Sequence, residues 1–244
     1  HFVFRGQAGD TLAFGASVDE VFSDRPNEAT CHIPLWTEYR YDMRDKLVEV
    51  AQGASILERF QYDAEGRLLK KIGESGVRQY VYDQTSRLVE YDENGLQVAK
   101  YTYGSDRLIS LQHRTEGTRF YHLDGLGSVP ALTDPAGAVT SRLHLDAWGV
   151  FKNAAELDAS ANRHAFTGYV FEREIGLYFA KARFYDPEVG RFISQDSYLG
   201  QVDDPPSLHR YFYAGSRPTY FRDATGHWWT KEDWKNAGKC CVAR

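Results

Sequence analysis

Short apolar and aromatic runs, separated by turns that contain Asp and Gly, fill most of the first half of the chain. In each unit an aromatic run precedes the turn and a Leu-Val type run follows it, as in Tyr62-Asp-Ala-Glu-Gly-Arg67-Leu-Leu. Asp and Gly between two such runs favour a tight hairpin turn. The pattern therefore predicts an all-β protein built from short antiparallel hairpins.

The hairpin unit repeats with a period of about twenty residues. Its Tyr residues are spaced 21, 20 and 21 apart, and a further Tyr91-Asp pair falls between two of the copies. We expect two short strands in each period, and stacked hairpins that share one apolar face, because a single hairpin is not stable alone. The copies begin at Tyr41, Tyr62, Tyr82 and Tyr103.

The repeat fades after residue 120, and strand patterns resume at Ala165–Tyr169, Ile175–Tyr185 and Gly190–Ser194. After Gly226 the composition changes to a segment rich in Trp and charge. We expect three regions: repeated strands in 1–120, a core region of modified repeats and further strands in 121–226, and the start of a different module in 227–244.

The charge, cysteine content and apolar runs of the chain argue against several classes of function. The net charge is −5, and Lys and Arg are scattered, which excludes an electrostatic footprint for nucleic acid. Cys31, Cys240 and Cys241 give neither a disulfide framework nor a metal spacing, so we expect reduced thiols, no metal and no cofactor. No apolar run approaches the ~20 residues that cross a bilayer. Because residue 1 is His, we expect a processed product or a piece of a longer chain.

The stretch from Arg210 to Trp228 holds the candidate chemistry. Asp223 precedes a Gly-marked turn at Gly226, and an Asp beside a guanidinium stays ionised and can act on water. Asp196 is a candidate second carboxylate, because two carboxyl groups in one pocket split their pKa values. An Asp before a Gly is also a common turn residue, so a purely structural role stays open.

Several ordered motifs resemble the Rhs (YD-repeat) proteins and their core domain over about residues 40–226. These are the Tyr-Asp repeats, His122–Ser128, Asp146–Gly149, Phe166–Leu177, Ala182–Asp196 and the stretch to Gly226. The resemblance implies a β-sheet that spirals into a hollow cocoon, with a C-terminal toxin released inside by autoproteolysis. On this reading residues 1–120 are strands of the shell, residues 121–226 curl inward as a plug, and the toxin region begins at 227. Insecticidal Tc toxin C components and the teneurins share this architecture.

In that family the core ends in two Asp-Pro-x-Gly motifs, and the toxin begins after the second. Here the motifs are Asp196-Ser-Tyr-Leu-Gly200 and Asp223-Ala-Thr-Gly226, so both keep the Asp and lose the Pro. The resemblance implies that Asp223 is the principal catalytic group, with Arg210 its electrostatic partner and Asp196 the second carboxylate. We expect an aspartic-type autoprotease that cuts next to Gly226, at His227–Trp228.

The expected partners follow from the same resemblance. They are the chain's own toxin fragment, held non-covalently after cleavage, the remaining N-terminal shell, an immunity protein, and a delivery apparatus such as type VI secretion or a Tc complex. We expect a bacterial cytoplasmic stage before export to a target cell. Two alternatives stay open: a structural teneurin-like or wall-associated scaffold that does not cleave, and a tail that begins a toxic enzyme.

Overall fold

The architecture was analysed in a computed structural model, which describes residues 12–13, 36–104, 107–153, 155, 160–200, 202 and 205–227. Every element that lies wholly within these ranges is a strand or a short 3-10 helix, which confirms the all-β prediction. No helix in the described part of the chain is long and apolar enough to span a membrane. Cys31, Cys240 and Cys241 lie outside the described residues.

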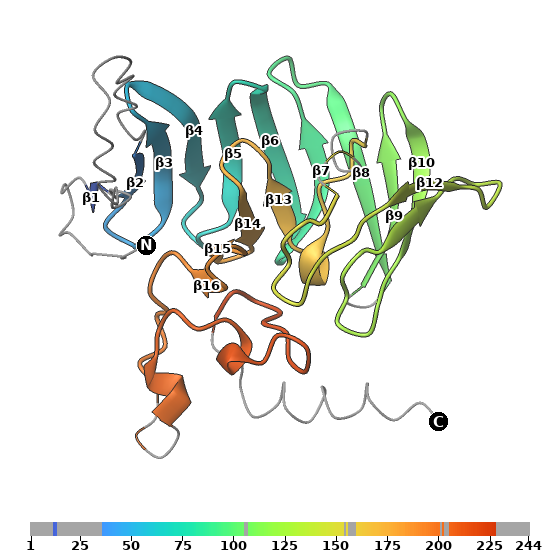
Figure 1. Ribbon diagram of the computed structural model, residues 1–244. Coiled ribbons are helices and arrows are strands. Elements are labelled where there is room, and N and C mark those ends of the chain that lie inside the picture. The colour runs from blue at the N-terminus through green and yellow to red at the C-terminus, as the bar shows by residue number, and fades with distance from the viewer. Residues whose placement is uncertain are drawn as a thin grey trace, which may run out of the picture.

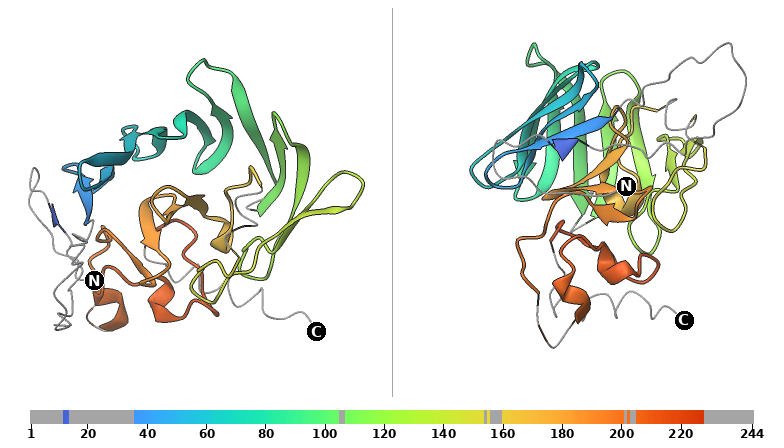
Figure 2. Two further views of the ribbon diagram at one scale, coloured as in Figure 1. Left: turned by 45° about the horizontal axis from the view of Figure 1, so that its top comes forward. Right: turned by 60° about the vertical axis from the view of Figure 1, so that its left-hand side comes forward.

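The first sheet has twelve antiparallel strands in strict chain order, each paired with its neighbours in sequence. Figures 1 and 2 show it as a curved wall, with later parts of the chain inside the curve. This arrangement confirms the predicted stack of hairpins. The strands are β1 (Leu12–Ala13), β2 (Thr37–Tyr41), β3 (Leu47–Gln52), β4 (Ser55–Tyr62), β5 (Leu68–Gly73), β6 (Gly76–Asp83), β7 (Ser86–Tyr91), β8 (Gln97–Gly104), β9 (Arg107–His113), β10 (Gly117–His122), β11 (Ala131–Thr133) and β12 (Val139–Arg142).

The Tyr-Asp pairs lie at the turns between strands. Asp42 follows β2, and its Oδ1 accepts hydrogen bonds from the backbone N–H groups of Arg44 (2.8 Å) and Lys46 (2.9 Å). An Asp side chain that binds backbone amides in this way closes the turn locally. The out-of-phase pair at Tyr91 and Asp92 forms the turn between β7 and β8, so each period contains two strands, as predicted.

The second sheet has four antiparallel strands and lies inside the curve of the first (Figure 2). All four residues of its second strand are buried. Leu177 and Phe179 pack in a cluster with residues of the first sheet such as Val50, whereas Tyr178 belongs to a second cluster that includes Tyr213. The inner sheet is therefore covered on both faces. Its strands are β13 (Val170–Glu172), β14 (Leu177–Ala180), β15 (Arg183–Asp186) and β16 (Arg191–Phe192).

Two local expectations were wrong. Ala165–Tyr169 is not a strand, because Phe166–Gly168 forms the 3-10 helix η1, with a positive φ of 47° at Thr167. Ile175–Tyr185 is not one strand but the hairpin of β14 and β15, which turns at Lys181 with a φ of 61°. The two remaining 3-10 helices are η2 (Pro205–Leu208) and η3 (Ala214–Ser216).

The first sheet continues beyond residue 120. β11 pairs with β10 and β12 pairs with β11, so residues as far as Arg142 belong to the wall. The segment that lies inside the curve begins after these strands (Figures 1 and 2). The division into regions at residues 120 and 226 stays a prediction.

Candidate functional site

Two buried aspartates meet at one arginine. Asp196 and Asp223 are each 3% exposed, and Arg183 of β15 is 5% exposed. The Arg183 Nη2 lies 2.8 Å from Asp196 Oδ2 and 3.5 Å from Asp223 Oδ2. The structure thus brings together the two aspartates that the sequence singled out, on a guanidinium that it did not single out.

The rest of the Arg183 guanidinium is held just as closely. Its Nε donates a hydrogen bond to the carbonyl oxygen of Gly226 (2.5 Å), and its Nη1 donates to the carbonyl oxygen of Arg210 (3.0 Å). Its carbon Cζ lies 3.7 Å from the centre of the Phe192 ring. Because the guanidinium is planar and presents its donors in a fixed fork, these contacts determine its orientation.

Asp223 also organises the turn that ends at Gly226. Its Oδ1 accepts hydrogen bonds from the backbone N–H groups of Gly226 (2.9 Å) and Thr225 (3.2 Å), and the Tyr169 hydroxyl donates to the Asp223 carbonyl oxygen. Gly226 has a φ of +76°, and a Cβ there would lie 2.0 Å from the Ala180 carbonyl oxygen. Only glycine fits this position, so the turn presses against the end of β14.

The two carboxyl groups have different affinities for a proton. Burial raises the pKa of Asp223 to about 6, although Arg183 opposes the shift. Burial also acts to raise the pKa of Asp196, but the contacts with His227 and Arg183 outweigh it and leave that pKa below its usual range. Asp223 therefore binds a proton more tightly than Asp196, and the closer contact with Arg183 belongs to Asp196.

The remaining predicted residues have these positions. Arg210 does not take the place beside Asp223 that the sequence predicted: its Nε donates to the Asp196 carbonyl oxygen (2.7 Å) and its Nη1 to Gln195 Oε1 (2.6 Å). Arg210 is closer than Arg183 to Asp223 in the sequence, but it is Arg183, on the inner sheet, whose guanidinium contacts the Asp223 carboxylate. His227 Nδ1 lies 3.4 Å from Asp196 Oδ1, and Trp228 lies outside the described residues.

Sequence reasoning therefore missed Arg183. This residue lies in the Ala182–Asp196 motif that supported the family resemblance, but nothing in its local pattern shows that the chain folds back to place it against Gly226. The available signal was its position next to the two aromatic residues of the strand Arg183-Phe-Tyr-Asp186, since a charge that folding buries among aromatic side chains requires a partner.

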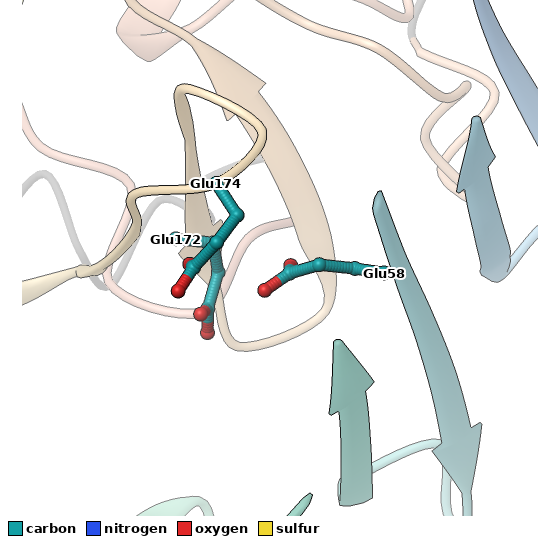
Figure 3. Close-up of side chains that lie close together, drawn as sticks. All are labelled: Glu58, Glu172 and Glu174. Atoms are coloured by element: carbon teal, nitrogen blue, oxygen red, sulfur yellow. The ribbon is translucent and has the colours of Figure 1, made fainter. Parts of the chain in front are cut away.

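A second buried cluster joins the two sheets. Lys71 of β5 lies with its Nζ 2.7 Å from Glu58 Oε1 and 2.6 Å from Glu172 Oε2, and 3.6 Å from Glu174 Oε2. Figure 3 shows the three carboxylates pointing toward one another, Glu58 from the wall and the other two from the inner segment. Three such oxygens suit a cation, and the Lys71 ammonium supplies it from within the chain.

Comparison with known proteins agrees with this architecture. The model of the family described as Teneurin YD-shell matches residues 37–219, which is most of the chain. The chain belongs to the teneurin YD-shell family. This confirms the resemblance to the YD-repeat proteins that the Tyr-Asp periodicity predicted.

Curated relatives with YD-shell similarity include bacterial toxins and nucleases. The tRNA3(Ser)-specific nuclease WapA of Bacillus spizizenii is 32% identical over 196 residues, covering 78% of this chain and 8% of that protein. The probable deoxyribonuclease RhsA of Dickeya dadantii is 26% identical, covering 79% of this chain and 14% of that protein. The chain thus matches a small part of these proteins and is a YD-shell segment of the Rhs type.

Solved structures show the same fold. The crystal structure of TcdB2-TccC3-TEV has a TM-score of 0.60 and 19% identity, and the match covers 78% of this chain and 10% of that one. The structure of TcdB2-TccC3 alone gives a TM-score of 0.59 at 20% identity, with the same coverage of both chains. The curved wall with an inner segment is therefore the YD-shell fold found in this Tc assembly.

Proposed function

We propose that this chain is part of the shell of an Rhs-type toxin, and that it releases a C-terminal toxin by cleaving its own backbone next to Gly226. The observation that supports this most directly is the convergence of Asp196, Asp223 and the Gly226 carbonyl on the Arg183 guanidinium. A buried pair of carboxyl groups with separated pKa values is the arrangement that acid–base hydrolysis of a peptide requires.

The groups have complementary roles in this mechanism. Asp196, the member with the lower pKa, accepts a proton from water as the water oxygen attacks the Gly226 carbonyl carbon. Arg183 Nε already donates to that carbonyl oxygen and stabilises the negative charge that develops on it. Asp223 in its protonated form gives a proton to the His227 nitrogen, the carbon–nitrogen bond breaks, and the products are a Gly226 carboxyl group and a His227 amine.

This geometry favours the Gly226–His227 bond over the His227–Trp228 bond that the motif suggested. The Gly226 carbonyl is the one that a buried guanidinium contacts, and the rigid turn around Asp223 holds it in place. Both motifs lack the proline, and in each turn the aspartate instead accepts a hydrogen bond from a backbone N–H group of the same turn, for example from Tyr198 to Asp196 Oδ1 (2.9 Å).

The biological setting follows from the toxin relatives. A double-stranded DNA deaminase toxin A of Burkholderia cenocepacia is 27% identical over 65% of this chain. By analogy we place the shell in a bacterium before export, with the released fragment held non-covalently until delivery to a target cell by type VI secretion or a Tc-like complex, and an immunity protein in the producer.

The decisive experiment is the intact mass of the purified chain and of Asp223→Asn. We expect the natural chain to give a fragment that ends at Gly226 and Asp223→Asn to give only the uncut mass. Asp186→Asn is a matched control, since Asp186 closes a turn on β15 and lies outside the site. A natural chain that stays uncut under native conditions, with a mass pattern that Asp223→Asn does not change, would instead indicate a structural scaffold.

A toxic enzyme that begins in the tail is the remaining alternative, suggested by the toxin and nuclease names of the relatives. Its test is to express the region after residue 227, together with whatever follows it in the full gene. Growth inhibition would support a toxin there, and normal growth would count against it.

A further inference from the structure

His227, the first residue after the proposed cut, reaches back to the site that makes the cut. Its Nδ1 lies 3.4 Å from Asp196 Oδ1 and 3.5 Å from the Ser197 hydroxyl oxygen. Its backbone N–H donates a hydrogen bond to Thr225 Oγ1 (3.4 Å), so the residue is held at both its backbone and its side chain. The segment that leaves therefore supplies one of the groups that surround the proposed base.

The ring nitrogen of His227 that faces Asp196 carries a proton. The pKa of Asp196 lies below its usual range, so its carboxyl group is ionised at neutral pH and can only accept hydrogen bonds. An unprotonated Nδ1 would point a lone pair at this carboxylate. Nδ1 therefore holds a proton and donates toward Asp196 Oδ1, whether the imidazole as a whole is neutral or charged.

The contacts of Asp196 leave little of its carboxylate open. A carboxylate offers about four lone-pair positions, two on each oxygen. On Oδ1, one accepts from the Tyr198 backbone N–H (2.9 Å) and the other faces His227. On Oδ2, one faces Arg183 Nη2 at 2.8 Å. Contacts with described residues thus leave one position, on Oδ2, next to the guanidinium that also contacts the Gly226 carbonyl. A water that gives its proton to Asp196 would bind there.

The charged groups around Asp196 come from different parts of the chain. Arg183 comes from β15, and His227 follows the last turn. Asp223 contacts the same guanidinium at 3.5 Å, and Arg210 donates to the backbone carbonyl of Asp196 rather than to its carboxylate. Burial favours the protonated form of Asp196. Among these charged groups, only Arg183 and His227 contact the carboxylate with a donor and favour its ionised form.

We propose that His227 is a positioning residue for its own release: its imidazole holds Asp196 in place and in the ionised form, so that the segment that leaves assists the cut. This inference rests on the proposed self-cleavage and adds a residue to it. After the cut His227 belongs to the released fragment. When that fragment leaves, Arg183 remains as the cationic contact of the Asp196 carboxylate among the described residues.

The first test is the pH dependence of the cleavage rate in His227→Leu, which removes the donor. In the natural chain the rate should be constant from about pH 6 to about pH 4, because Asp223 is protonated and Asp196 ionised there. In His227→Leu it should fall at the acid end of this range, by up to about tenfold for each pH unit, because Asp196 takes up a proton. His227→Asn should keep the natural profile, since its amide N–H can donate to Asp196. His122→Leu is the matched control, because His122 is exposed on β10 and lies outside the site.

The second test does not require cleavage. Carboxyl-carbon NMR follows the titration of Asp196 in Asp223→Asn, with and without His227→Leu, and circular dichroism at each pH shows that the chains are folded. The His227 side chain is 45% exposed, so its variants should fold. We expect the loss of His227 to move the Asp196 titration to higher pH.

Coincident Asp196 titrations would overturn the role of His227, whether or not the chain cuts itself. A natural chain that cuts, with a His227→Leu rate lowered by the same factor at every pH, would show a merely structural role and would overturn this inference alone. A natural chain that stays uncut would overturn the proposed self-cleavage, and this inference with it.

Discussion

At the scale of single residues, the central feature is the unequal environment of Asp196 and Asp223. Both are buried to the same degree, but Arg183 lies 2.8 Å from one and 3.5 Å from the other. Burial raises the pKa of a carboxyl group, and a close cation lowers it. The contact of His227 with Asp196 and the unequal contacts of Arg183 separate the two pKa values, and the proposed mechanism assigns the base to Asp196 and the acid to Asp223 on that basis.

The rate of self-cleavage should depend on pH in the direction set by Asp223. The pKa of Asp223 is raised to about 6, and the mechanism uses its protonated form, so the rate should fall about tenfold for each pH unit above that value. Asp196 stays ionised throughout, because its pKa is lowered. The measurement is the fraction of cut chain with time after cell-free synthesis and transfer to buffers of different pH. A rate that rises steadily with pH would contradict the assignment.

Arg183→Lys should slow cleavage about 100-fold or more, the usual effect of losing a donor to a developing oxyanion. A lysine cannot contact Gly226, Asp196 and the Arg210 carbonyl together. Arg210→Lys is the matched comparison, with an expected loss of about tenfold or less, because the Arg210 guanidinium donates to the Asp196 backbone carbonyl and to the Gln195 side chain rather than to the Gly226 carbonyl in the described structure. Cleavage time courses of the two variants, both checked for folding, show which substitution slows cleavage more. If Arg210→Lys slowed cleavage more than Arg183→Lys, Arg210 rather than Arg183 would be the arginine that supports the reaction.

At the scale of elements, hairpin turns and one buried ion cluster hold the strands in register. The turn aspartates act locally: Asp63, for example, accepts from the backbone and side chain of Arg67 four residues later. Such short-range contacts can be predicted from the Tyr-Asp pattern alone. The Lys71 cluster, in contrast, connects β5 with the inner segment 101 residues away, and no local pattern indicates it.

Lys71→Met should destabilise the fold by about 3–5 kcal/mol, because it leaves the Glu172 carboxylate buried without its cation. Glu58→Gln should cost less than about 1 kcal/mol at neutral pH, since burial raises the pKa of Glu58 to about 8 and the neutral form already predominates. Urea unfolding of both variants measures the difference. Equal losses would show that Glu58 is ionised in the native state.

The same cluster gives a stability change with pH. The pKa of Glu58 is higher in the folded state (about 8) than its ordinary value of 4.5, so the folded state holds the extra proton between these values. Stability should therefore fall as pH rises through this window, and Glu58→Gln should flatten that dependence. Unfolding free energies measured across the window provide the check.

At the scale of the whole molecule, the inner sheet supplies much of the hydrophobic core against which the strands of the wall pack. Each face of β14 packs in its own hydrophobic cluster, and both clusters contain residues of the wall and of the inner segment, so the two parts should unfold as one unit. This packing also brings β15 and Arg183 to the end of the chain's last described turn. The site is thus a product of the closure of the inner segment against the wall.

Leu177→Ala should reduce the free energy of unfolding by about 2–5 kcal/mol, because Leu177 is 2% exposed and packs between the two sheets. Leu199→Ala removes the same atoms at a position that is 73% exposed and should change stability by less than about 0.5 kcal/mol. Denaturant unfolding followed by fluorescence and by circular dichroism should give one coincident transition. Two separate transitions would show that the wall folds without the inner sheet.

The amino-acid sequence by itself determined the features that depend on neighbours in the chain. Repeated Tyr-Asp pairs specify the hairpins, because an aspartate binds backbone amides only a few residues away, and the Asp223-to-Gly226 turn follows the same rule. Only the tertiary structure decided which arginine contacts both aspartates and which aspartate has the higher pKa. Both depend on burial and on contacts across 40 residues of chain, between Arg183 and Asp223. Such electrostatics arise only when folding removes water and brings distant charges together.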